Sequence, residues 1–430
     1  MELTQTTLPS GLSREKHLRW FFIAWLTVAT ILNYLDRQTL SILAPVLRDE
    51  FHLSNQAYSR IVSSFLISYT VMYTAGGRFV DWVGERVGMA ISIAWWSVAT
   101  MLHSLAAGAV SFGVFRFLLG IGEPANYPAA LKAAIAWFSE DERGLPVAIY
   151  TSGSAVGAVF APPLITWIAL RYGWRYAFVL PGSMGLLWVI VWLRTYRRPA
   201  RGTAEIATEE AGATVRPRWA TLLRDRNVIA LVAARFLADP VWYFYLFWIP
   251  EYLKRSRGFT LGDIGLYGWI PFLAADIGGV FGGFASDRLI KAGMPAATAR
   301  RLVLYCFSAV APVGVFTGFA KSPATAVALM AIGGFVCFVW FVNTAALVSD
   351  VFAAPVVGSV LGILGTAGSG AGALFTLLVG FLADRGSYVS VFVIAGSMHL
   401  LASVVLFLCM KPARHCASTS EVAQPQIGRS

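Results

Sequence analysis

Charged residues are scarce in this sequence. Asp, Glu, Lys and Arg together make up 13% of its 430 residues, whereas about a quarter is usual in soluble domains. Hydrophobic residues account for 57%, and the mean hydropathy is +0.65. Because so few charged side chains cannot cover a globular protein in water, the composition excludes an ordinary soluble protein. It predicts a multi-pass membrane protein with the lipid bilayer around much of the chain.

Cysteine and histidine are also few and scattered. The four cysteines form no CxxC pair, which argues against a disulfide framework and against a zinc site. The five histidines form no cluster along the sequence. We therefore expect no metal and no cofactor. The sequence also lacks a Ser/His/Asp arrangement or a pair of catalytic carboxylates, so we do not expect an enzyme.

Positive charge exceeds negative charge, but it is not gathered in one place. The formal net charge is +11 at pH 7. The Lys and Arg residues stand in short groups between apolar segments, whereas a nucleic-acid-binding protein gathers them on one face. We therefore expect no nucleic-acid partner.

Apolar segments recur along the whole chain. A helix needs about 20 apolar residues to cross a bilayer. Twelve such segments lie near 20–46, 57–77, 89–109, 111–138, 145–169, 176–194, 227–250, 263–285, 302–320, 325–349, 356–382 and 388–410. The division of 89–138 into two segments rests on its length. The sequence therefore predicts an all-α membrane protein with twelve transmembrane helices.

One long charged segment divides these helices into two sets. It defines a linker at 195–226 between a first six-helix bundle at 20–194 and a second at 227–410, with tails at 1–19 and 411–430. Residues 219–223 within the linker are typical of a short interfacial helix. With the N-terminus inside, roughly twenty of the 34 Lys and Arg residues fall on inner segments and roughly nine on outer loops. This bias predicts that the linker and both termini are cytoplasmic.

The two halves resemble each other. The second segment opens with the motif at 51–58 and ends in Gly77-Arg-Phe-Val-Asp81; the eighth opens with a similar motif at 259–267 and ends in Gly283-Phe-Ala-Ser-Asp287. Such a repeat is typical of transporters built from two bundles. In these proteins the substrate binds between the repeats, near the middle of the membrane.

A motif of glycines and charged residues lies at the end of the second segment and in the loop after it. Gly77, Asp81, Gly84 and Arg86 resemble the loop motif of the major facilitator superfamily. In this motif glycine allows close helix packing, and the aspartate can pair with an arginine and accept hydrogen bonds at a helix end. Glu85 departs from the pattern, because the family usually has a basic residue there. The resemblance implies two pseudo-symmetric six-helix bundles and says nothing about the substrate.

Two opposite charges, Asp36 and Arg37, stand side by side about halfway along the first segment. A charge inside a bilayer costs at least ~2.5–3.5 kcal/mol on insertion scales, so it normally faces a bundle interior or a cavity and finds a partner. Neighbouring residues on a helix diverge by about 100°, so the two side chains cannot point the same way. One can line a cavity while the other reaches another helix. An ion pair that only fixes helix packing is the alternative.

The fourth segment carries Arg116 and Glu123. They are seven residues apart, which places them on one helix face about 10 Å from each other, too far for direct pairing. Each needs a partner on another helix or on a substrate. A carboxylate in an apolar environment tends to take up a proton unless a cation stabilises its charge. Glu123 is thus a candidate proton carrier, with a purely structural charge as the alternative.

The second half has its own buried charges. Arg235 and Asp239 are four residues apart on one helix and can pair, and Pro240 then disturbs that helix. Asp276 lies about midway along the eighth segment. Arg235 can bind a substrate carboxylate in a fork geometry, or it can serve only as a salt-bridge partner of an aspartate.

Two uncharged residues of this half are further candidates. Trp242 can stack on a sugar ring, although a tryptophan in the core or facing lipid is the more common case. Asn343 can bind a hydroxyl group or hold two helices together.

Several motifs resemble the anion:cation symporter family, which includes proton-coupled sugar-acid carriers of bacteria and the vesicular glutamate and sialic acid carriers. They are Asn33-Tyr34-Leu-Asp36-Arg37, Arg116-x6-Glu123, Tyr69, and Gly153-x3-Gly157-x4-Pro162-Pro163. The run from Arg235 through Asp239 to Trp242, with Trp248-Ile-Pro250 and Ala275-Asp276, most resembles the hexuronate transporters. The resemblance implies proton-coupling roles for Asp36 and Glu123. It implies substrate-binding or gating roles for Tyr34, Arg37, Tyr69 and Arg116.

We therefore expect a monomeric, proton-coupled symporter of a small organic anion in a bacterial inner membrane, working by alternating access. The expected substrate is a hexuronate such as glucuronate or galacturonate. A symporter of another organic anion, such as an aldonate or a dicarboxylate, is the near alternative. An efflux antiporter is a more distant one, because the fifth segment lacks the GxxxGPxxGG pattern of drug antiporters.

Overall fold

The computed structural model describes residues 10–138, 142, 144–197 and 219–410. Within these ranges the chain is helical and contains no β-strand. The helices of the first half are α1 (Ser10–Glu50), α2 (Asn55–Val83), α3 (Glu85–Leu102), α4 (Ala109–Gly122), α5 (Asn126–Trp137), α6 (Gly144–Tyr172) and α7 (Trp174–Thr195). Short 3-10 turns, η1 (His103–Leu105) and η2 (Glu123–Ala125), follow α3 and α4.

The second half repeats this plan. Its elements are α10 (Arg226–Arg257), α11 (Leu261–Tyr267), α12 (Ile270–Lys291), α13 (Ala296–Ser308), η3 (Ala311–Phe319), α14 (Pro323–Val351), α15 (Ala354–Asp384) and α16 (Tyr388–Cys409). The short helix α9 (Trp219–Leu222) precedes it, at the place where the sequence predicts a short helix. Most of the predicted linker, residues 1–9 of the predicted N-terminal tail and the whole predicted C-terminal tail lie outside the described residues.

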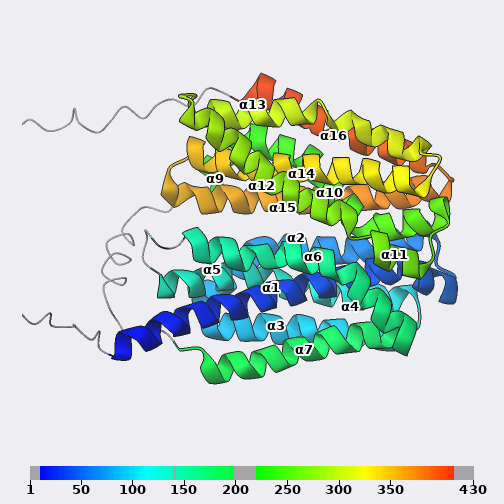
Figure 1. The fold of residues 1–430 in the computed structure, drawn as a ribbon, viewed down its shortest axis with the longest axis horizontal. Coiled ribbons are helices and arrows are strands. Elements are labelled where there is room, and N and C mark those ends of the chain that lie inside the picture. Colours follow the sequence, from blue (N-terminus) through cyan, green and yellow to red (C-terminus); the bar gives the residue numbers. More distant parts are fainter. Residues whose placement is uncertain (1–9, 139–141, 143, 198–218, 411–430) are drawn as a thin grey trace, which may run out of the picture.

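The helices form two bundles that lie side by side along their length (Figure 1). In the view of Figure 1, α1–α7 make the lower bundle, α10 and α12–α16 make the upper one, and α11 lies at the right beside the lower bundle. The bundles meet where α2 contacts α15, α1 contacts α10, and α6 contacts α11 and α12. We call the end of the molecule where α7 stops and α10 begins the linker end. The opposite end, where α1 stops at Glu50 and α10 stops at Arg257, is the far end.

Ten helical segments among the described residues are long and apolar enough to cross a membrane. Two other predicted spans complete the set of twelve. One is α2, whose serines and threonines lower its hydropathy, and the other is the segment 111–138, which the 3-10 turn η2 interrupts. The prediction of an all-helical membrane protein with two bundles is confirmed.

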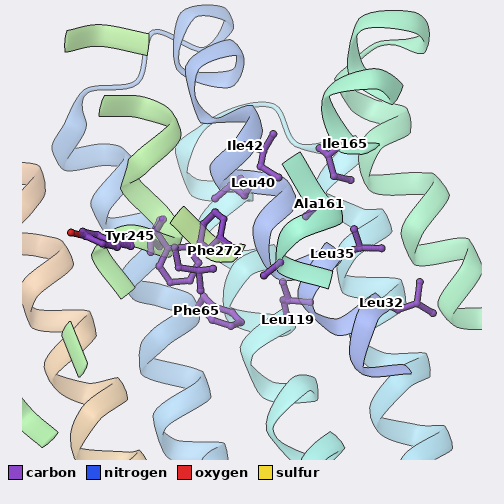
Figure 2. Close-up of a cluster of buried hydrophobic side chains, with 14 of the residues drawn as sticks. Leu32, Leu35, Leu40, Ile42, Phe65, Leu119, Ala161, Ile165, Tyr245 and Phe272 are labelled. Atoms are coloured by element: carbon purple, nitrogen blue, oxygen red, sulfur yellow. The ribbon is translucent and has the colours of Figure 1, made fainter. Parts of the chain in front are cut away.

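Apolar packing is continuous across the two bundles. The larger cluster of buried side chains contains residues from both halves, and Figure 2 shows a part of it. There, Phe65 of α2 and Phe272 of α12 belong to one apolar group. The two halves are thus packed against each other as well as within themselves.

Ion pairs fasten the two bundles at the far end. Arg48 of α1 pairs with Glu251 of α10, and Arg255 of α10 pairs with both Asp49 and Glu251. The Asp384 carboxylate of α15 accepts the first backbone N–H groups of α2 at 2.8 and 3.0 Å. Within the described residues, every ion pair that joins the two halves lies at this end.

The loop motif between α2 and α3 is placed at the linker end. Gly84 has φ +81° and ψ 162°, a conformation that is almost confined to glycine. Asp81 pairs with Lys132 of α5, and the Arg86 guanidinium donates to the Leu193 carbonyl of α7 at 2.5 Å. Gly77 has open space around its Cα.

Candidate functional site

An ion pair lies in the middle of the first bundle. Nε and Nη2 of Arg37 donate to the same Glu123 oxygen, Oε2, at 2.9 and 2.6 Å. Nη2 also donates to the Asn33 side chain at 3.3 Å. The Arg37 side chain is 8% exposed and that of Glu123 is fully buried. Hydrogen bonds to ionised groups are stronger than neutral ones, so this pair holds α1 and α4 in one arrangement.

The local sequence explains how Glu123 reaches α1. Helix α4 ends at Gly122, and Pro124 follows in the turn η2, so the carboxylate extends from a break in the helix. Side chains at 120 and 122 would overlap the neighbouring helices: Gly120 packs on Ser68 of α2 and Gly122 packs on Trp95 of α3. The glycines thus allow α4 to approach both helices closely at this level.

Aromatic rings surround the Arg37 guanidinium. Its Cζ atom lies 5.0 Å from the ring centre of Tyr34, 4.9 Å from that of Tyr69 and 5.6 Å from that of Phe65. These distances are within the range of cation–π attraction. Gly157 of α6 packs against Tyr34, where a larger residue would overlap it. Tyr34, Arg37 and Tyr69, which the sequence predicts as binding residues, therefore form one cluster.

Asp36 points away from Arg37. Its buried carboxylate lies beside Trp96 and Thr100 of α3, and it forms no hydrogen bond of standard geometry within the described residues. It also forms no ion pair there. Nη2 of Arg116 donates to the Arg37 backbone carbonyl at 3.1 Å, which links the two arginines. Arg116 thus contacts α1 at the level of the Arg37–Glu123 pair.

A second ion pair lies in the second bundle. Nη2 of Arg235 is 2.9 Å from Oδ2 of Asp239, one turn further along α10. The guanidinium also lies 4.4 Å from the ring centre of Phe341 on α14. Gly368 of α15 packs directly against the Asp239 carboxylate, and any larger residue there would overlap it. Among the aspartates of this half, Arg235 thus pairs with Asp239.

The remaining candidates of the second half differ in their surroundings. Asp276 is half-buried on α12, one turn beyond Phe272. Trp242 is half-buried against Phe272 and Phe338, with ring centres 5.8 and 4.5 Å away. Asn343 is fully buried and donates to the Val339 carbonyl at 2.9 Å. The contacts of Trp242 and Asn343 lie inside the second bundle, so they do not join the Arg37 cluster.

Sequence reasoning missed two groups of residues. Tyr73 of α2 packs on Gly365 of α15 across the contact between the bundles, and Tyr243 of α10 packs on Gly372 of α15 within the second bundle. The far-end charges are the second group. A signal for them existed, because Glu251 follows an apolar run directly and needs a partner there. Their pairing spans about two hundred residues and has no local signature.

The described residues contain no group of three or more His, Cys, Asp or Glu side chains that could hold a metal ion. The site is therefore a set of arginines, carboxylates and tyrosines. Such a set can bind an anion, exchange ion-pair partners and hold protons.

Comparisons with known proteins agree with this architecture. Residues 26–299 match the Major Facilitator Superfamily. The hexuronate transporter of Escherichia coli strain K12 is 32% identical over 415 residues, covering 93% of this chain and 96% of that protein. The galacturonate transporter of Dickeya chrysanthemi is 34% identical over 282 residues, covering 63% of this chain and 81% of that protein.

Solved structures resemble the fold. The crystal structure of a D-xylose–proton symporter has a TM-score of 0.74 and 18% sequence identity, and it covers 91% of this chain and 97% of its own. The predicted resemblance to hexuronate transporters is confirmed by the relatives. From its fold, its sequence match and its relatives, this chain is a multi-pass membrane transporter that belongs to the Major Facilitator Superfamily.

Proposed function

We propose that this transporter imports a hexuronate, such as glucuronate or galacturonate, together with protons across a bacterial inner membrane. The observation that carries the proposal is the buried Arg37–Glu123 pair, with both nitrogens on one carboxylate oxygen. Relatives named hexuronate and galacturonate transporters support the choice of substrate. We further propose that the protein works as a monomer with both termini in the cytoplasm.

The ion pair makes the substrate and the proton interdependent. A guanidinium binds a carboxylate through a planar fork of N–H donors. While Glu123 is ionised, it occupies that fork of Arg37. A proton on Glu123 removes its charge and frees Arg37 for the carboxylate of a sugar acid. Proton and substrate therefore enter in the same state of the carrier.

Asp36 supports a second protonation step. It is buried next to Arg37 in the sequence, without a hydrogen bond of standard geometry in the described part of the chain. The three site arginines face four carboxylates: Arg37, Arg116 and Arg235 against Asp36, Glu123, Asp239 and Asp276. Without a proton, an incoming anion would add to this negative excess in a medium of low dielectric. That cost favours symport over uncoupled anion entry.

The aromatic side chains suit the rest of a sugar acid. Tyr34 and Tyr69 flank Arg37, so their rings and hydroxyl groups stand next to any carboxylate bound there. A hexuronate carries one carboxylate and several hydroxyl groups on a ring. Tyrosine offers both an apolar face and a hydrogen-bonding group to such a molecule.

The test is uptake of radiolabelled glucuronate into proteoliposomes with an imposed inward proton gradient. We compare the wild type with Glu123→Gln. The matched control is Glu142→Gln, because Glu142 forms a surface ion pair with Arg19 at 2.7 Å, with side-chain exposures of 47% and 22%. Wild type and control accumulate glucuronate, whereas Glu123→Gln loses gradient-driven accumulation and keeps counterflow exchange. Uptake that does not depend on the proton gradient would refute proton coupling. Absence of glucuronate transport would refute the substrate assignment.

A further inference from the structure

Two of the four carboxylates of the site form an ion pair: Glu123 with Arg37, and Asp239 with Arg235. Asp36 and Asp276 form none within the described residues. Asp276 of α12 forms no ion pair within the described residues, and no cation acts on it there. It is half-buried, whereas Asp36 is 1% exposed and Glu123 2%. Of the two unpaired carboxylates, Asp276 is thus the accessible one.

Asp276 faces the region where a bound substrate would extend. Its helix, α12, contacts α6 of the first bundle. Asp276 lies one turn beyond Phe272 on this helix, and Phe272 shares an apolar group with Phe65, whose ring centre lies 5.6 Å from the Arg37 guanidinium. A molecule whose carboxylate is held by Arg37 therefore has Asp276 near its other end, on the opposite bundle.

We propose that Asp276 is a specificity-determining residue that selects acids with one carboxylate and rejects acids with two. Its carboxylate accepts hydrogen bonds from the hydroxyl groups of a sugar acid, because an ionised carboxylate is an acceptor only. The same charge repels a second carboxylate at the far end of an aldarate such as glucarate. The inference rests on the proposed function, since it takes Arg37 as the partner of the first carboxylate.

The expected discrimination follows from Coulomb's law. Two unit charges about 7 Å apart, at an effective dielectric constant of about 20, repel strongly enough to change affinity roughly 50-fold. Water in an accessible site screens part of this repulsion, so we expect a preference of roughly tenfold. A residue that attracts one class of ligand and repels another should affect the two binding affinities in opposite directions when its charge is removed.

The experiment measures binding of matched acids to the purified transporter by isothermal titration calorimetry at pH 7. Glucuronate is compared with glucarate, and galactonate with galactarate; within each pair, one member has one carboxylate and the other has two. The variants are Asp276→Asn and Asp276→Glu. Asp287→Asn is the matched control, because Asp287 lies on the same helix at the linker end and pairs with Arg300 at 3.1 Å.

The wild type should prefer the acid with one carboxylate in each pair by roughly tenfold. Asp276→Asn should bind the dicarboxylates roughly threefold better and the monocarboxylates roughly threefold worse, so that the preference disappears. Asp276→Glu and Asp287→Asn should keep it. Equal wild-type affinities, or a preference that persists in Asp276→Asn, would overturn the inference. A wild type that binds galactonate but not glucuronate, and loses its preference in Asp276→Asn, overturns the hexuronate assignment and leaves this inference standing.

Discussion

Replacing Glu251 by glutamine should open the far end of the transporter. The side chain is fully buried between the bundles and pairs with Arg48 of α1 and Arg255 of its own helix. Glutamine keeps the size of the side chain and removes the charge. Arg48 then loses its ion pair and retains its hydrogen bonds to the Asn55 side chain at 2.7 Å and the Leu53 carbonyl at 3.0 Å.

The size of the effect follows from the partners that remain. Removing one member of a buried ion pair costs about 3–5 kcal/mol when the other charge is left alone. Because Arg48 keeps two hydrogen bonds, we expect about 2 kcal/mol, which multiplies the equilibrium constant for far-end opening roughly 30-fold. A state populated at about 1% would rise to about a quarter of the molecules.

The assay is a distance distribution between spin labels at His52 and Lys254, measured by double electron–electron resonance in a cysteine-free background. These positions lie at the far end on different bundles. Glu50→Gln is the matched control, because Glu50 is at the same end but accepts from Trp174 of its own bundle at 2.6 Å. A longer distance should appear in Glu251→Gln and not in the control. The same distribution in both variants would refute the view that this ion pair holds the bundles together.

Three further outcomes follow from single contacts. Gly368→Ala should abolish uptake without loss of expression, because its methyl group displaces the ion pair of the second bundle; Gly362→Ala, in open space on the same helix, should transport normally. Gly84→Ala should lower the melting temperature in detergent at a cost on the order of 1–3 kcal/mol, whereas Gly77→Ala should not. Asp384→Asn should populate the same longer spin-label distance as Glu251→Gln. The population of this opened state should rise by only roughly 2- to 5-fold, because the substitution weakens an interaction with the N-terminus of α2.

The fold could be predicted because lipid imposes a simple requirement on sequence. An apolar segment of helical length must span, so hydropathy and length locate the helices. The sequence-based prediction missed features of helix ends and helix breaks, which hydropathy does not report. Helix α1 begins at Ser10, well before the predicted span at 20–46, because a polar helix can continue outside lipid. The turn η2 that interrupts 111–138 depends on the local effect of Pro124 on the backbone.

The candidate site could be predicted only as a set of residues. A charged residue inside an apolar segment can be recognised in the sequence, and its free-energy cost in the bilayer implies that it has a partner. Which residue is the partner depends on the tertiary structure. Arg37 and Glu123 are 86 residues apart, and only the break after Gly122 brings them together. The absence of an ion-pair partner for Asp276 within the described residues likewise depends on the packing of α12. The proton-coupling and binding roles of these residues stay predictions until transport is measured.

The modest hydropathy of α2 has a consequence for how the protein is made. Two of the predicted spans do not qualify as membrane helices by length and composition alone. These are α2 and the interrupted segment α4–α5. These two segments pack against each other, with Gly120 seated on Ser68. We therefore expect α2 to become stable in the membrane only after α4, which packs on it, has been inserted. Substitutions that enlarge Gly120 should thus appear first as failed insertion and degradation of the nascent chain, before any defect in transport can be seen.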